Sequence, residues 1–286
     1  SGYCDPTAVF NDIEPSEEIS AEHIEEMREY NKNTDYVRQL SEAYSKAEKY
    51  TSEVVYFFEQ VTGHLIPDMR PALAHGIESL IADIEKRISA ETDSERKANL
   101  EAMKIALEAA VILAGRYSAL AKEKAEKASG ESKERFELMA KTLAKVPAKG
   151  ADNLYEAIQS FIILWQVMCI EQSPNPFAFS VGNADRIFEP YRAKENLSRE
   201  LASALFKHFL VFFNVGDRSW AISQNIILGG RDVDGNDLSN ESTFALFDAY
   251  YDMNLPQPIL SVKLHKNTPD SIYEAMGKFF FTPGML

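Results

Sequence analysis

Apolar positions recur at steps of three and four over much of the chain, which is the spacing of one face of an α-helix. The longest such run comprises Leu100, Met103, Leu107, Val111, Ala114, Tyr117 and Ala121. Ser129-Gly130 then turns the chain, and a second apolar face follows at Phe136, Met139 and Leu143. The pattern predicts a helical hairpin between Glu95 and Val146.

Further helices are predicted on both sides of this hairpin. Ser20 caps a helix that runs to Tyr30, and another helix is expected over 71–88. The helix after Asp152 is apolar on all sides, which indicates burial on several sides. Ser198 and Asn240 are expected to cap two more helices.

Strand-like segments appear in the last third of the chain. A short run at 177–181 and longer ones at 220–228 and 259–264 favour strands, and a helix is predicted after each of the longer two. The expected fold class is mostly α with a few β-strands (α/β). We expect a helical region at 1–150 and an α/β part at 151–286, within one continuous but incomplete domain.

Composition narrows the possible partners. The 286 residues are 45% apolar, and 44 acidic against 30 basic residues give a net charge of -14. This acidity disfavours nucleic acid and anionic membrane as partners. The sequence also lacks a signal-peptide pattern and a membrane-spanning run, so a cytoplasmic location is expected.

Several residue types offer candidate chemistry. Only Cys4 and Cys169 are present, without a metal-binding spacing, so no metal site is expected. His64 follows a glycine in a loop and either binds a ligand or caps local structure. Ser180 is either a ligand-binding hydroxyl or a turn serine bonded to nearby backbone. The aspartates after Gly229-Gly230 fit a structural turn better than a phosphate or calcium loop.

Four stretches resemble the glycyl radical enzymes, the group that includes pyruvate formate-lyase (formate acetyltransferase) and the diol, choline and hydroxyproline lyases. They are Gly63-His-Leu-Ile-Pro-Asp68, Ser180-Val-Gly-Asn-Ala-Asp-Arg-Ile-Phe-Glu-Pro-Tyr191, Asn225-Ile-Ile-Leu-Gly-Gly230 and Gln257-Pro-Ile-Leu-Ser-Val-Lys-Leu-His265. The resemblance starts near residue 60 and covers most of the chain. It implies part of an α/β barrel joined to a large helical region.

The same resemblance implies site residues. His64 and Ser180 are expected to line a substrate cavity, and Asp185 and Arg186 are further candidates. Asn183 stands where the family usually has arginine, which removes a bidentate clamp for a carboxylate or phosphate. Lys263 replaces another frequent arginine and retains the charge but not the planar fork.

The resemblance also implies the reaction and its partners. In the family, an activating enzyme that uses S-adenosylmethionine and an iron–sulfur cluster installs a glycyl radical under anaerobic conditions. A cysteine thiyl radical then abstracts a hydrogen atom from a small-molecule substrate. The His64 and Ser180 pair favours a dehydratase-type C–O lyase acting on a small hydroxylated substrate.

Both radical loops are expected downstream of the segment that ends at Leu286. The isolated chain is therefore expected to be an internal, truncated piece, catalytically incomplete, that binds no cofactor itself and self-associates through exposed apolar surface. Two alternatives stay open. One is a non-catalytic helical scaffold that uses the 95–146 hairpin, and the other is a half-barrel subunit with exposed strand edges near 220–228 and 258–264.

Overall fold

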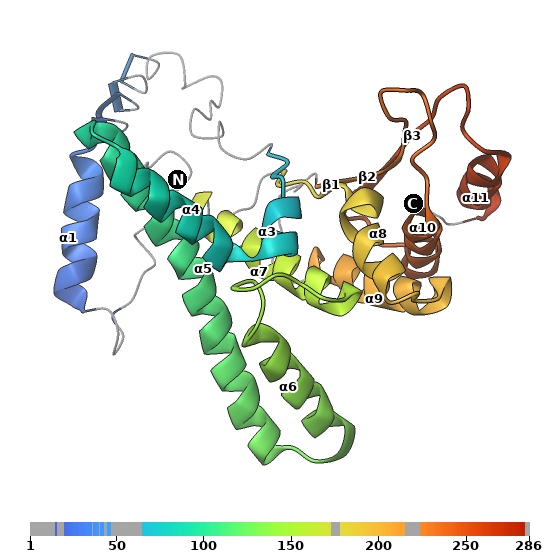
Figure 1. Ribbon diagram of the computed structural model, residues 1–286, viewed down its shortest axis with the longest axis horizontal. Coiled ribbons are helices and arrows are strands. Elements are labelled where there is room, and N and C mark those ends of the chain that lie inside the picture. Colours follow the sequence, from blue (N-terminus) through green and yellow to red (C-terminus); the bar gives the residue numbers. More distant parts are fainter. Residues whose placement is uncertain are drawn as a thin grey trace.

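The computed structural model describes residues 15, 20–35, 37–39, 41–42, 45–46, 65–172, 178–214 and 224–283. Within these ranges, helices dominate and a single small sheet lies in the C-terminal part (Figure 1). The helices are α1 (Ala21–Lys32), α3 (Arg70–His75), α4 (Ile77–Ala90), α5 (Ser94–Lys127), α6 (Gly130–Leu143), α7 (Leu154–Gln172), α8 (Ala184–Lys194), α9 (Arg199–Phe212), α10 (Glu241–Met253) and α11 (Asp270–Phe281). The expected class, mostly α with a few strands, is confirmed.

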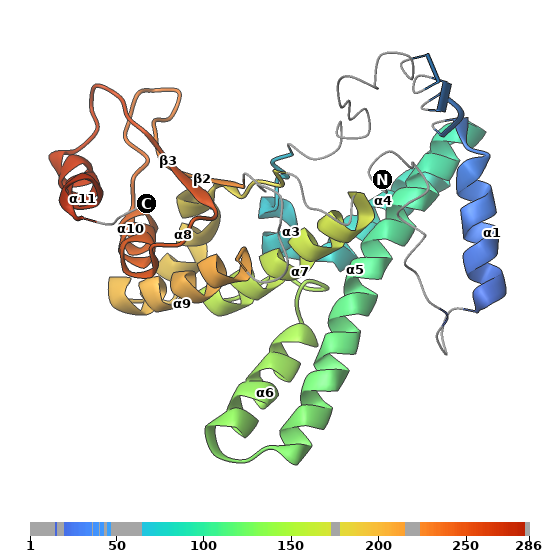
Figure 2. The same ribbon diagram turned by 180° about the vertical axis from the view of Figure 1, so that it is seen from behind.

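The predicted hairpin is formed by α5 and α6, which lie side by side and extend away from the rest of the molecule (Figures 1 and 2). The buried face of α5 agrees in part with the predicted one. Ala114 and Ala121 are buried as expected, together with Ala110 and Ala125, whereas Met103 and Tyr117 are 56% and 41% exposed. Small side chains allow the two helices to approach closely, and Ser118 donates from Oγ to the Ala140 carbonyl at 2.7 Å.

The helix expected over 71–88 is interrupted at Gly76, so α3 and α4 are separate helices. Gly76 has φ 81°, and a Cβ there would lie 2.4 Å from the Ala148 carbonyl oxygen. The segment before α7 crosses at this point, and Ile77 and Glu78 donate their amides to the carbonyls of Pro147 and Ala148. Glycine is needed because the two chain segments touch backbone to backbone.

The sheet consists of three parallel strands in the order β1 (Gly182–Asn183), β2 (Asn225–Gly229) and β3 (Ile259–Lys263). Ile226 pairs with Gly182 on one side and with Leu260 on the other, so β2 is central. The exposed edge that a half-barrel requires is therefore absent at 225–228. Residues 220–223 lie outside the described residues. Ile259 on β3 is 47% exposed.

One face of the sheet is covered by helices. Ile226 and Leu228 are fully buried and belong to the main hydrophobic core, and α8, α9 and α10 lie on one side of the strands (Figure 1). That core contains a cluster of aromatic rings in which Phe209 contacts Phe161, Phe188 and Phe213 edge to face. Leu73 on α3 and Ile272 on α11 belong to the same core, so one hydrophobic core includes residues from both sides of residue 150. The division of the chain into two regions at residue 150 stays a prediction.

Helix caps follow the sequence closely. His23 donates its amide to Ser20 Oγ, and Leu201 donates its amide to Ser198 Oγ. Asn240 forms a reciprocal capping box with Thr243 at the start of α10. These short-range interactions fix the starts of α1, α9 and α10.

Candidate functional site

Ser180 lies just before β1, where three segments of the chain meet. Its amide donates to the Leu65 carbonyl at 2.9 Å, and its Oγ accepts from the Asn225 amide at 3.1 Å. The side chain is 7% exposed. The donor is the backbone of a strand 45 residues later in the chain and not of a local turn, and the hydroxyl hydrogen of Ser180 remains available to donate.

His64 lies outside the described residues. The next residue, Leu65, is described, and its carbonyl accepts the bond from Ser180. Ile66 also packs closely here, because a Cβ at Gly182 would lie 2.6 Å from Ile66 Cγ2. Gly182 has φ 76°, a conformation that glycine adopts without strain. The segment after His64 is therefore fixed against the start of β1.

Asp185, in the first turn of α8, is fully buried and accepts three hydrogen bonds. Its Oδ2 accepts from the Gly229 amide at 2.7 Å and from Thr243 Oγ1 at 2.8 Å, and its Oδ1 accepts from the Arg186 amide at 2.8 Å. Burial raises the pKa of this carboxyl, and the three donors oppose that shift. These contacts tie α8, the end of β2 and α10 together.

Arg186 extends over the end of β2. Its Nη2 donates to the Gly229 carbonyl at 2.7 Å, and its buried Nε has no hydrogen-bond partner among the described residues. One of the five N–H groups of the guanidinium is thus used for the backbone. Asn183 pairs with Ile227 in the sheet, and its buried Oδ1 likewise has no partner in the part of the chain that the structure describes.

Asn225 is a polar residue that sequence reasoning did not single out. Its backbone amide donates to Ser180 Oγ, and its side-chain Nδ2 donates to Ser261 Oγ at 2.9 Å. Its Oδ1 is buried and has no partner among the residues that the structure describes. The available signal was an asparagine at the start of an otherwise apolar strand, because asparagine is uncommon in strands.

The loops after β2 and β3 are bound to each other. His265 Nε2 lies 3.0 Å from Asp237 Oδ1, and Asn267 Nδ2 donates to the Gly235 carbonyl. Asp232 accepts from the amides of Asp234 and Asn236. The expected structural turn after Gly229-Gly230 is therefore confirmed.

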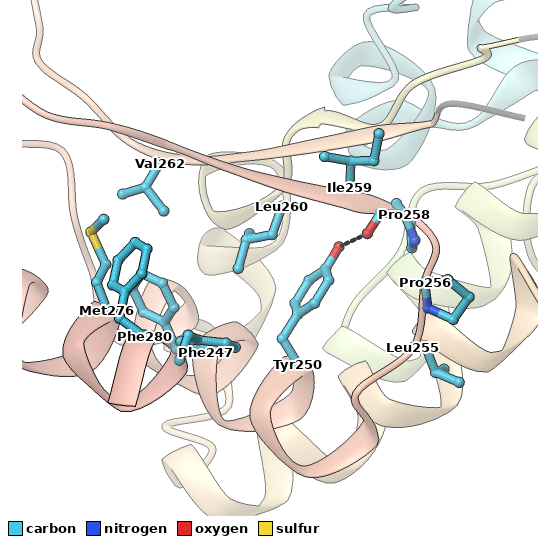
Figure 3. A pocket seen from close by; sticks show the side chains of 11 residues that line it. Phe247, Tyr250, Leu255, Pro256, Pro258, Ile259, Leu260, Val262, Met276 and Phe280 are labelled. Atoms are coloured by element: carbon cyan, nitrogen blue, oxygen red, sulfur yellow. Dashed lines mark hydrogen bonds between the residues drawn. The ribbon is translucent and has the colours of Figure 1, made fainter. Parts of the chain in front are cut away.

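An apolar pocket lies on the helix-covered side of β3 (Figure 3). Its volume is about 360 Å³, and Tyr250 donates its hydroxyl to the Pro258 carbonyl at 3.0 Å. It is lined by Phe247, Tyr250, Leu255, Pro256, Pro258, Ile259, Leu260, Val262, Met276, Phe279 and Phe280. The tyrosine hydroxyl is already bonded within the protein, so this pocket offers apolar contact rather than catalytic groups.

Other candidate chemistry is limited in the part of the chain that the structure describes. No group of three or more His, Cys, Asp or Glu side chains there is arranged to hold a metal ion. Cys169 is buried within α7. Among the same residues, no helix has both the length and the apolar character required to cross a membrane.

Comparison with known proteins places this arrangement in a family. The profile described as "Pyruvate formate lyase-like" matches residues 8–285. The fold and the profile define the class, and the chain belongs to the pyruvate formate lyase-like family of glycyl radical enzymes.

Particular relatives include dehydratases and a sulfite-lyase. Trans-4-hydroxy-L-proline dehydratase of Clostridioides difficile is 33% identical over 68% of this chain and 27% of its own length. Isethionate sulfite-lyase of Desulfovibrio desulfuricans is 27% identical over 72% of this chain and 27% of its own length. The B12-independent glycerol dehydratase from Clostridium butyricum superposes with a TM-score of 0.70 at 26% identity, over 75% of this chain and 29% of that structure. The chain thus spans about a quarter of the length of its curated relatives.

Proposed function

We propose that this chain supplies the substrate-binding wall of a glycyl radical lyase, of the dehydratase type, acting on a small hydroxylated substrate. The observation that carries the proposal is the hydrogen bond from the Ser180 amide to the Leu65 carbonyl. Residue 64 directly precedes Leu65, so its Cα atom lies about 3.8 Å from the Cα atom of the residue that is hydrogen-bonded to Ser180. The bond supports a shared role for His64 and Ser180 in one cavity.

The roles follow from the chemistry of the side chains. Ser180 offers its hydroxyl hydrogen to a substrate oxygen, and His64 exchanges a proton with a hydroxyl group that departs as water. In the full reaction, a hydrogen atom leaves one carbon, the neighbouring hydroxyl leaves as water, and a hydrogen atom returns. A vicinal diol thereby gives an aldehyde and water without net oxidation. The thiyl and glycyl radicals supply the hydrogen-atom chemistry, and this wall positions the substrate.

Family membership favours this lyase over a non-catalytic scaffold, because a hydroxyproline dehydratase, an isethionate sulfite-lyase and a glycerol dehydratase share the segment. Activation by a separate S-adenosylmethionine enzyme, a cytoplasmic location and self-association belong to the same proposal.

The experiment uses the protein made from its native gene, activated anaerobically with its activating enzyme and S-adenosylmethionine. Electron paramagnetic resonance monitors the glycyl radical, and product NMR follows glycerol, 1,2-propanediol, trans-4-hydroxy-L-proline and isethionate. We expect turnover of at least one substrate and a KM about tenfold higher in Ser180→Ala. Ser203→Ala is the matched control, because Ser203 is buried in α9 with no partner for its hydroxyl. A radical without turnover of any hydroxylated substrate would contradict the proposal.

A further inference from the structure

The face of the sheet opposite the helices carries polar side chains. In a strand, alternate residues share a face, and paired residues of parallel neighbours point to the same side. Ile226 and Leu228 face the core, so Asn225 and Ile227 face away from it. Asn183 and Ser261 both pair with Ile227 and share this open face.

These residues form a compact row. Adjacent strands lie about 4.8 Å apart, so Asn183, Ile227 and Ser261 occupy neighbouring positions across the three strands. Asn225 lies two residues before Ile227 on the same face of the central strand, and its Nδ2 donates to Ser261 Oγ at 2.9 Å. The backbone amide of Asn225 donates to Ser180 Oγ at 3.1 Å. Asn225 therefore connects the hydroxyl groups of two serines that flank the central strand.

The direction of these bonds determines what the row offers a ligand. Both serine hydroxyls accept a bond from Asn225, so each retains its own hydrogen for donation. The row thus presents the Ser261 hydroxyl as a donor with a defined orientation, next to the hydroxyl of Ser180. If Asn225 did not donate, a serine hydrogen could turn toward the asparagine instead.

The row also presents acceptors. Asn183 Oδ1 and Asn225 Oδ1 are both buried and both lack a hydrogen-bond partner among the described residues. Buried carbonyl oxygens are bonded in the great majority of cases, because the loss of water bonds is costly. Two such oxygens on one sheet face are therefore free to accept hydrogen bonds from a ligand.

We propose that Asn225 and Ser261 form a second part of the substrate site, in which Asn183 also takes part, and that this part binds the uncharged, hydroxyl-bearing end of a small polyol-type substrate. The inference rests on the proposed function and extends it beyond His64 and Ser180. A substrate hydroxyl accepts from Ser261 and donates to a carboxamide oxygen. The polar groups of the row itself are uncharged hydroxyls and carboxamides, which suit hydroxyl groups of a ligand, and Lys263 is the next residue of β3 on the same face.

Two substitutions test the row in the same activated native protein. Ser261→Ala removes one donor, and we expect the KM for 1,2-propanediol or glycerol to rise about tenfold with kcat changed less than threefold. Asn225→Asp keeps the shape but replaces the donating amide with an acceptor, which turns the Ser261 hydrogen away from the ligand. We expect a similar rise in KM, and the double variant is expected to resemble Asn225→Asp alone.

Two controls separate binding from folding. Ser203→Ala removes a buried hydroxyl away from the sheet, and its KM is expected to match that of the unmodified protein. Binding of 1-propanol, which lacks the second hydroxyl, is expected to be insensitive to Ser261→Ala by ligand-observed NMR. If Asn225→Asp does not fold, Ser261→Ala and this ligand comparison still decide the question.

The outcomes distinguish the two proposals. A higher KM in Ser180→Ala with an unchanged KM in Ser261→Ala would overturn the row and leave the proposed function standing. Diol binding that depends on Ser261 in a protein without lyase turnover would support the row and reject the lyase. A large loss of melting temperature in a folded Asn225→Asp, with unchanged KM, would show that a protein segment satisfies the oxygens instead and would also overturn the row.

Discussion

The two faces of the three-stranded sheet satisfy their polar groups differently. On the helix-covered face, the buried Asp185 carboxylate accepts three hydrogen bonds from the protein. On the open face, Asn183 and Asn225 each leave a buried carbonyl oxygen without a partner among the described residues. The carboxylate beside the covered face is therefore satisfied within the protein, whereas the two amide oxygens of the open face keep bonding capacity for something further. The difference separates the part of the sheet that stabilises the fold from the part suited to binding.

The largest effect is expected on the covered face, at Phe209. This side chain is fully buried and contacts three other phenylalanine rings. Phe209→Ala removes these contacts and leaves a cavity, so we expect the free energy of unfolding to fall by about 4 kcal/mol. Urea denaturation of the chain measures it. Leu201→Ala on the same helix is the control, because Leu201 is 57% exposed. Equal losses in both variants would contradict the assignment of Phe209 to the core.

Asp185→Asn is expected to have the next largest effect. An amide has one acceptor oxygen in place of two, and its NH2 group would face the donating amide of Arg186. We expect a loss of about 2–3 kcal/mol in the free energy of unfolding, since a buried donor loses its partner. Asp234→Asn removes the same charge from an exposed position in the following loop and serves as the control. A loss below about 0.5 kcal/mol in Asp185→Asn would mean that the three hydrogen bonds to Asp185 contribute little to stability.

Tyr250→Phe examines the apolar pocket on the covered face. The change removes the donor to the Pro258 carbonyl and retains the ring that lines the pocket. We expect a loss of about 1 kcal/mol, because one neutral hydrogen bond disappears. Thermal denaturation at fixed pH measures it, with Tyr273→Phe as the control, since Tyr273 is 48% exposed. A melting temperature that is unchanged in Tyr250→Phe would show that the bond adds nothing to stability.

The smallest effect concerns the pH dependence of stability at Asp152, an exposed carboxylate that contrasts with buried Asp185. Hydrogen bonds from Lys145 and Lys194 lower the pKa of Asp152 from 3.8 to about 2. A lowered carboxyl pKa stabilises the fold above pH 3.8, and that contribution disappears as the pH falls toward 2. Asp152→Asn is therefore expected to lower the melting temperature slightly at pH 6 and to match the unmodified chain near pH 2. A larger difference at pH 2 than at pH 6 would contradict this assignment.

The pH dependence of stability has the opposite sign at Asp185. Burial raises the pKa of that carboxyl above its ordinary 3.8, so its protonated form is favoured in the folded state. Its contribution to stability falls as the pH rises from about 4 through the raised pKa. Comparison of Asp185→Asn with Asp152→Asn over pH 2–6 thus distinguishes a buried carboxylate from an exposed one.

Local patterns predicted the elements that depend on neighbours in sequence. The caps at Ser20, Ser198 and Asn240 and the strand at β3 agree with the structure because a few adjacent residues decide them. The break at Gly76 was not predicted, since it depends on a backbone segment more than 70 residues later in the chain. Similarly, Met103 and Tyr117 were predicted on the buried face of α5 but are exposed, because the helices that pack against α5 decide which positions are covered.

The candidate site shows the same division. His64 and Ser180 were identified through family resemblance, and Leu65 adds a described contact beside one of them. Asn225 was missed because its importance lies in its partners Ser180 and Ser261 on other segments and not in its own neighbours. Asp185 was a candidate through family resemblance, and only the coordinates show the three internal donors to its carboxylate.

By itself, the sequence determined the helical character, most element positions, the acidic charge and the resemblance to glycyl radical enzymes. These follow from composition, periodicity and short motifs, all of which are local properties of the chain. Only the tertiary structure decided which face of the sheet is covered, where Gly76 divides a helix, and which polar atoms remain without partners. Those features depend on contacts between distant segments, and hydrogen bonds of this kind exist only once packing has brought their donors and acceptors together.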